Sequence, residues 1–220
     1  MPRRPDDLRP RKSPRQERSR ATQQRILVAA ARVFADEGYP GTTTDRIAHA
    51  AGLSVGSLYQ YFGNKDAILH VLALSHLDQA DQAIRAALTD GKGGHQRWLP
   101  RLVEVVIASH RESPALQRVI FDQAPRSAEL VARFEESQQA AVTAIAELLR
   151  TDEIHPITAP DTTALLVAAS IESLTHRFIG SAAPITTEAL AEELIMMVAS
   201  YVAAAAGRCG ERGRPQVSSS

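Results

Sequence analysis

Apolar residues recur along this chain at intervals of three and four, the spacing that places them on one face of an α-helix. No stretch alternates in the manner of a β-strand, and glycine and proline clusters separate the periodic segments. The pattern predicts an all-α protein with about nine helices. The expected helices cover residues 19–37, 43–51, 55–62, 65–88, 96–110, 114–123, 128–150, 162–178 and 188–205.

Two short helices are predicted within residues 43–62, TTDRIAHAAGLSVGSLYQYF. Thr43 can cap the first helix and Ser54 the second, because their side-chain oxygens accept hydrogen bonds from backbone N–H groups. Gly52 suits the left-handed conformation that ends a helix, and Leu53 can fill the corner. The segment therefore predicts a helix-turn-helix.

The second short helix carries more polar groups than a core element needs. Its apolar residues Leu58 and Phe62 are four positions apart, whereas Ser57, Tyr59 and Gln60 face elsewhere. Hydroxyls and amides on an exposed helix suit base edges and phosphates in the major groove of DNA. The alternative is a solvated helical corner, and the segment alone leaves both interpretations open.

A three-helix core is expected around this motif. Ile26, Ala30, Val33 and Phe34 of the first helix should pack on apolar residues of the two short helices. Those partners are Ile47, Leu53, Leu58 and Phe62. Asn64 can then cap a fourth helix that begins at Lys65.

Charge divides the chain into two parts of opposite sign. Residues 1–65 carry 12 basic and 6 acidic side chains, a difference of +6, whereas residues 66–220 carry 13 and 19, a difference of −6. A basic N-terminal part can neutralise DNA phosphates. Residues 1–17 hold five arginines and four prolines, so they should be a disordered arm that either follows DNA or only aids solubility.

The sequence shows no targeting signal and gives little indication of cysteine chemistry. The chain has no run of 18 apolar residues and no secretory signal, so a cytoplasmic protein without a membrane partner is expected. Cys209 is the only cysteine, which excludes an intrachain disulfide.

Residues 25–69, RILVAAARVFADEGYPGTTTDRIAHAAGLSVGSLYQYFGNKDAIL, closely resemble the N-terminal domain of the TetR family of bacterial transcriptional regulators. The resemblance implies a three-helix DNA-binding domain at residues 20–66. It also implies a larger helical domain for ligand binding and dimerisation at residues 67–207, followed by a tail at residues 208–220 that we expect to be disordered.

The resemblance also implies positions that contact DNA. Arg20 and Lys65 match phosphate contacts, Thr44 matches a phosphate or base contact, and Tyr59 and Tyr61 match backbone contacts. Asp45 departs from the family by standing where some members carry a base-reading arginine, a role that Arg46 could take. The full set of expected DNA-binding residues is Arg20, Thr43, Thr44, Arg46, Ser54, Val55, Gly56, Ser57, Tyr59, Gln60, Tyr61 and Lys65.

The last two helices are candidates for a dimer interface. The final helix has apolar residues at spacings of four, three and four, the seam of a packed bundle. In the family the last two helices pair with their copies, whereas periodicity alone also allows a monomer core. The candidate interface residues are Leu166, Leu190, Leu194, Met197 and Tyr201.

A ligand site is harder to locate. Apolar and aromatic side chains of the middle helices could line a cavity or simply fill the core. Glu172 and His176 are four residues apart and could bond to each other, face a ligand or meet a partner subunit. The candidate ligand residues are Trp98, Leu102, Phe121, Phe134, Glu172 and His176.

No catalytic constellation, metal-binding spacing or phosphate-binding loop is present, so neither an enzyme nor a cofactor is expected. The sequence predicts a homodimeric repressor that a small, largely apolar molecule releases from palindromic double-stranded operator DNA. The alternatives are a helical regulator that acts through protein contacts without an effector, and an activator of the same fold.

Overall fold

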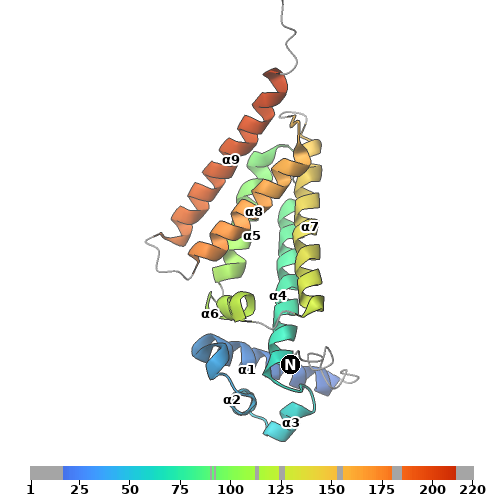
Figure 1. The fold of residues 1–220 in the computed structure, drawn as a ribbon, viewed down its shortest axis with the longest axis vertical. Coiled ribbons are helices and arrows are strands. Elements are labelled where there is room, and N and C mark those ends of the chain that lie inside the picture. Colours follow the sequence, from blue (N-terminus) through green and yellow to red (C-terminus); the bar gives the residue numbers. More distant parts are fainter. Residues whose placement is uncertain are drawn as a thin grey trace, which may run out of the picture. The chain divides into compact units, whose positions relative to one another are not determined.

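The computed structural model describes residues 17–211 except 90, 92, 112–113, 124–126, 153–155 and 180–184. Every element along this part of the chain is helical, which confirms the predicted all-α class. Residues 1–16 of the predicted arm and 212–220 of the predicted tail lie outside the described residues, whereas α1 begins at residue 17 and α9 extends through residues 208–211 of the segment predicted to be disordered. The elements are α1 Glu17–Gly41, α2 Thr44–Ala50, α3 Val55–Tyr59, α4 Lys65–Leu88, α5 His95–Arg111, α6 Pro114–Arg118, the π-helical turn η2 Val119–Gln123, α7 Ala128–Arg150, α8 Pro160–Phe178 and α9 Thr187–Glu211 (Figure 1).

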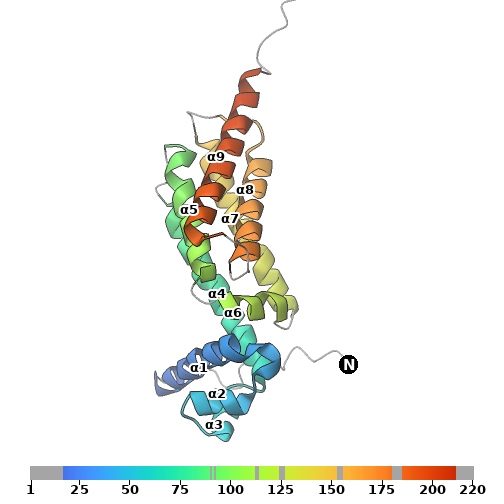
Figure 2. The same ribbon diagram turned by 90° about the vertical axis from the view of Figure 1, so that its left-hand side faces the viewer.

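Contacts divide the helices into two compact units. The first unit comprises Met1–Asp78 together with Ser113–Phe134, and the second comprises Gln79–Glu112 together with Glu135–Ser220. The predicted boundary lies after residue 66, whereas the first unit extends to Asp78. Both positions are inside α4, so this helix contributes residues to both units. Because α6 and η2 contact α1, a segment distant in sequence joins the first unit (Figure 2).

The core of the first unit contains the predicted three-helix contacts. Ile26, Phe34, Ile47, Leu58 and Phe62 are all fully buried. Their burial is worth roughly 1.5–3 kcal/mol for each large side chain, so packing holds the two short helices in place. Val119, Ile120 and Leu130 complete this core from the α6–α7 segment.

The predicted caps are present. The Thr43 side chain accepts a hydrogen bond from the Arg46 N–H, and the Ser54 side chain accepts one from the Ser57 N–H. Asn64 Oδ1 accepts the Ala67 N–H at 2.8 Å at the start of α4. Gly52 has a φ of 64°, so the turn between α2 and α3 has the left-handed residue that it requires.

The second unit packs α5, α8 and α9 against one another. The buried face of α5 carries Trp98, Leu102 and Val106 at spacings of four, which is the pattern of a helix with one face in the core. Leu88 of α4 and Leu149 of α7 also belong to this core.

Candidate nucleic-acid interface

The first turn of α3 forms an exposed edge of the first unit. Ser54 caps the helix and its Oγ lies 2.8 Å from the Ser57 Oγ, so the two hydroxyls are held together beside the backbone N–H groups of that turn. Leu58 anchors the helix in the core, while Gly56, Tyr59 and Gln60 are exposed. The polar groups of this turn are therefore accessible to base edges and phosphates in the major groove of DNA.

Nothing in the described part of the chain requires a glycine at position 56. It lies within α3 and is not among the glycines with positive φ, and a Cβ built on it would meet no atom within 4 Å. Glycine in a helix costs about 1 kcal/mol relative to alanine. The missing side chain leaves the backbone of this turn open, so another molecule has room to approach it closely.

Two of the predicted DNA-contacting hydroxyls bond to each other. Thr44 Oγ1, at the start of α2, lies 3.0 Å from the Tyr59 hydroxyl at the end of α3. The pair fixes the two helix ends relative to one another, and the Tyr59 side chain is 40% exposed. Tyr61 differs from Tyr59, because it is half-buried and packs on the core.

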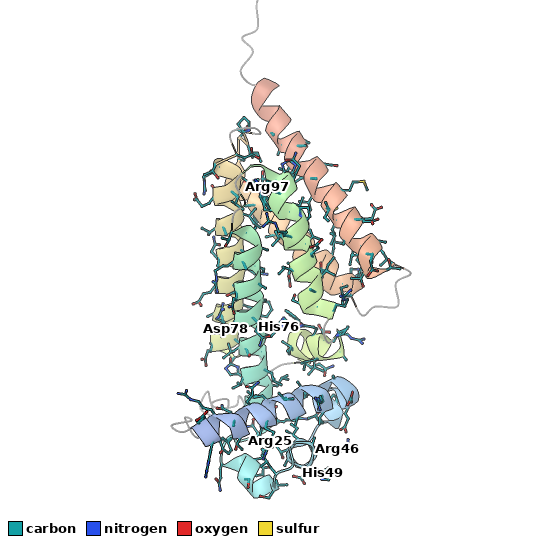
Figure 3. All side chains as sticks on the ribbon, turned by 180° about the vertical axis from the view of Figure 1, so that it is seen from behind. Arg25, Arg46, His49, His76, Asp78 and Arg97 are labelled. Atoms are coloured by element: carbon teal, nitrogen blue, oxygen red, sulfur yellow. The ribbon has the colours of Figure 1, made fainter. Side chains whose placement is uncertain are left out.

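The basic side chains of this unit have different surroundings. Arg20 is exposed on α1. Arg46 forms an ion pair with Glu37 and donates to the Gly41 carbonyl at 3.2 Å, so it lies against the end of α1. Figure 3 shows Arg25, Arg46 and His49 around α1 and α2.

Lys65 is engaged inside the first unit. Its Nζ donates to the Tyr39 carbonyl at 2.7 Å and to the Thr42 carbonyl at 3.0 Å, and it lies 4.1 Å from the centre of the Tyr39 ring. The Tyr39 hydroxyl bonds to the buried Asp66 carboxylate. The start of α4 thus holds the link between α1 and α2.

The six candidate ligand residues do not gather in one place. Trp98 and Leu102 are buried in the core of the second unit. Phe121 and Phe134 belong to the first unit, where their rings meet edge to face at 5.2 Å.

Glu172 and His176 of α8 meet a residue that the sequence analysis did not single out. His110 Nε2 lies 3.5 Å from Glu172 Oε1, and the rings of His110 and His176 are 6.0 Å apart. His110 also donates through Nδ1 to the Val106 carbonyl at 2.9 Å. The sequence did contain a signal for a buried histidine, because His110 follows Ile107 by three residues and therefore shares the apolar face of α5.

The pKa of His110 is raised above its ordinary value of 6.5. Burial lowers the pKa, but hydrogen bonding and charge attraction from Glu172, with the Val106 carbonyl, together outweigh it. A raised pKa means that the folded state binds this proton more tightly than the unfolded state. The stabilisation is therefore complete below pH 6.5 and is lost as the pH rises through the folded-state pKa.

We predict that Glu172→Gln removes this pH dependence. Urea unfolding between pH 5.5 and 8.5 should give an advantage of wild type over Glu172→Gln that is largest at low pH and declines as the pH rises. Since the other titrating groups are shared, their contributions cancel in the difference. A difference that is constant across the range would contradict the assignment to His110.

The candidate dimer residues divide by burial. Leu190 and Leu194 are 4% and 2% exposed, and they pack in the core of their own chain. Leu166 and Met197 are 47% and 43% exposed. With the half-buried Tyr201 they line an apolar groove of about 270 Å³ between α8 and α9, so these three are the candidates that could meet another molecule.

The last helix also passes a simple test for a membrane span. Within Thr187–Gly207 an 18-residue window has a mean hydropathy of 1.5, and 28% of that window is buried. Length and composition of this kind are also found in core helices of proteins outside membranes, so they are weak evidence for a span.

Two family models match the chain. Residues 26–72 match the model described as bacterial regulatory proteins of the tetR family, and residues 96–201 match the tetracyclin repressor-like C-terminal domain. The first match contains the whole helix-turn-helix, and the second contains α5 to α8 and most of α9.

Three curated relatives match the chain over 59 to 72 residues. The chain is 44% identical over 59 residues to the regulator HbdR of Aromatoleum sp. (strain CIB), which is 27% of this chain and 26% of HbdR. It is 36% identical over 72 residues to the activator FasR of Mycolicibacterium smegmatis, covering 33% of each protein. It is 40% identical over 62 residues to the repressor AcnR of Corynebacterium glutamicum, covering 28% of this chain and 32% of AcnR. The aligned stretch thus spans a quarter to a third of these relatives.

Solved structures match over most of the chain. A TetR-family regulator from Mesorhizobium loti gives a TM-score of 0.69 at 21% identity, covering 86% of this chain and 98% of that one. AibR, solved in complex with isovaleryl coenzyme A and operator DNA, gives 0.62 at 20% identity, covering 80% and 97%. At these identities the likeness establishes the fold.

Proposed function

The chain belongs to the TetR family of transcriptional regulators, and from that premise we propose that it is a repressor that binds palindromic operator DNA as a homodimer. It is a regulator and not an enzyme. The observation that supports DNA binding most directly is the exposed first turn of α3, with its paired serine hydroxyls and open backbone at Gly56.

The proposed contacts fall into two groups. The backbone N–H groups and hydroxyls of Ser54 and Ser57, with Val55 beside them, would meet base edges. Exposed Arg20 and the Thr44–Tyr59 pair would meet phosphates, which position the protein without reading sequence. Lys65 would support these contacts from within, because two protein carbonyls hold its ammonium group.

Selection of duplexes from a random library tests DNA binding directly. The full chain should enrich a palindromic sequence, and its affinity should fall steeply as salt rises because phosphate contacts release counterions. Enrichment of no sequence, together with binding that does not depend on salt, would contradict the proposal.

Gly56→Ala should separate the DNA-facing role of Gly56 from folding. Alanine is the better helix former, so the free energy of unfolding should stay equal or rise by up to about 1 kcal/mol. Operator affinity should fall by roughly tenfold, the loss expected for about 1.4 kcal/mol of displaced contact. Fluorescence anisotropy with labelled operator and urea unfolding measure the two quantities.

Gly207→Ala is a matched control. Gly207 is also helical, and a Cβ there would also meet no atom within 4 Å, but it lies near the end of α9. This variant should keep wild-type operator affinity. Equal affinities of Gly56→Ala and Gly207→Ala would show that no molecule approaches Gly56 closely.

The proposed effector is a small, largely apolar molecule that binds in the second unit. Trp98 and Leu102 lie in the apolar core of that unit, and Glu172 and His176 of α8 lie beside the buried His110. The AibR complex, which holds isovaleryl coenzyme A and operator DNA, supports an effector for this chain as well. We propose that the effector acts through α4, which contributes residues to both units.

Reciprocity provides the test of effector control. If a ligand weakens operator binding, operator must weaken ligand binding by the same factor, typically about 1–3 kcal/mol of coupling. A metabolite library screened by thermal shift identifies ligands, and calorimetry with and without operator measures the coupling. Identical ligand affinities in the two titrations would contradict release by that ligand. FasR, which this chain matches over 72 residues, is named a transcriptional activator, so activation is the alternative and reporter expression decides the direction of control.

A further inference from the structure

Tyr39 lies near the end of α1, after the kink at Gly38, in the segment that links the straight part of α1 to the helix-turn-helix. Gly38, with φ 67° and ψ 175°, breaks the regular conformation of α1 immediately before it. The Tyr39 carbonyl and hydroxyl are bound by Lys65 and Asp66 at the start of α4. Its N–H donates to Gln123 Oε1 at 3.2 Å, which is a contact across 84 residues of sequence.

Gln123 comes from a part of the chain that no sequence feature connected with DNA binding. It lies outside residues 26–72 of the N-terminal family match and inside residues 96–201 of the C-terminal match. Contacts nevertheless place it in the first unit. Val119 and Ile120 of the same turn are 3% and 4% exposed in that core, so the turn is anchored there.

Side chains on both sides hold the turn in its position. The Phe121 ring meets the ring of His76 on α4 edge to face at 6.1 Å and that of Phe134 on α7 at 5.2 Å. The Gln117 amide lies 3.2 Å from His76 Nδ1. Figure 3 shows His76 on α4, beside Asp78, whose carboxylate accepts from Arg133 at 2.8 Å.

The turn has a π-helical hydrogen-bond pattern, which is rare and occurs frequently at functional sites. A π-turn includes one more residue than an α-turn, so it changes the direction in which the following side chains point. Here Val119 and Ile120 enter the core while Gln123 stays exposed and meets the Tyr39 N–H. A hydrogen bond to an exposed acceptor contributes little to the free energy of unfolding, so stability alone is a weak explanation for the contact between Gln123 and Tyr39.

We propose that Gln123 is a positioning residue for DNA binding. By accepting the Tyr39 N–H, it fixes the direction in which the chain leaves α1 and therefore the orientation of α2 and α3. Lys65 and Asp66 hold the other polar atoms of Tyr39, so Gln123 supplies the remaining restraint on this link. This inference rests on the proposed function, because orientation of α3 matters only if α3 meets DNA.

The experiment compares four variants of the full chain with wild type on the selected operator duplex. Gln123→Met removes the acceptor at similar size, and Gln123→Glu keeps an acceptor oxygen. Gln139→Met and Gln139→Glu make the same changes at an exposed position of α7, whose side chain donates only locally to Thr143. Hydrogen exchange at the Tyr39 amide and operator affinity are measured for each.

For Gln123→Met we expect faster exchange of the Tyr39 amide and an operator affinity about two- to tenfold weaker, the range that one hydrogen bond supports. The salt dependence of binding should not change, because no phosphate contact is lost. Gln123→Glu should restore slow exchange, and its affinity should match that of Gln139→Glu, which measures the effect of the added charge. Gln139→Met should match wild type.

Three results would overturn the inference, and each has a different consequence for the proposed function. If wild type binds duplex and Gln123→Met binds it equally well, Gln123 does not position the motif, although DNA binding stands. If wild type binds no duplex, the proposed function fails and this inference fails with it. A Tyr39 amide that exchanges equally fast in wild type and Gln123→Met would overturn the hydrogen bond itself.

Discussion

Replacing Leu166 and Met197 together by glutamate should convert the protein to monomers and weaken operator binding by about 100-fold or more, the usual worth of linking two binding modules. Both side chains are more than 40% exposed in the single chain and line the groove between α8 and α9. Leu165 of α8 and Met196 of α9 are also exposed, at 54% and 57%. Clustered exposed apolar residues of this kind mark surfaces that meet a partner.

Sedimentation velocity measures the oligomeric state and anisotropy measures operator binding. Val131→Glu is the control, because Val131 is 42% exposed on α7 but lies in the other unit. It should leave the dimer intact. A dimeric double variant with wild-type helix content would show that the two copies meet elsewhere.

Leu194→Glu would be a poor probe of the same interface. Leu194 is 2% exposed within its own chain, so a carboxylate there would be buried without a partner. Unfolding, not dissociation, is the expected result. Periodicity shows which residues share a helix face, but it does not show whether that face meets the same chain or another, and this is why Leu190 and Leu194 stood beside Leu166 in the sequence-based set.

Local signals in the sequence predicted the helix-turn-helix well. Caps at Thr43, Ser54 and Asn64 and the left-handed Gly52 all depend on residues within a few positions of each other. For the same reason, the predicted bounds of α4 and α7 match the structure at both ends. Such features could be predicted because short-range hydrogen bonds determine them.

Features that depend on distant residues could not be predicted in this way. Residues 114–123 had the pattern of one helix, but the structure has α6 followed by the π-helical turn η2. Tertiary packing of Val119 and Ile120 accompanies that change. The side-chain contacts of His110, Arg46 and Gln123 with other helices likewise could not be predicted. Periodicity identifies residues that share a face of one helix, and it carries no information about which helices meet.

Lys65→Met should lower both the stability of the protein and its affinity for operator. The lost ammonium group donates to the Tyr39 and Thr42 carbonyls and lies over the Tyr39 ring, so we expect the free energy of unfolding to fall by about 2 kcal/mol. Operator affinity should fall about tenfold or more, because α2 begins two residues after Thr42 and loses part of its attachment to α4.

The salt dependence of operator binding distinguishes this internal role of Lys65 from a phosphate contact. A lysine that neutralises a phosphate contributes about one unit to the slope of log affinity against log salt. For Lys65→Met we expect no change in slope, because protein carbonyls hold the ammonium group. Arg20→Gln is the contrasting variant: Arg20 is exposed, so the slope should fall by about one unit while the free energy of unfolding stays constant. A reduced slope for Lys65→Met with unchanged stability would return Lys65 to the phosphate-contacting role that the family resemblance implies.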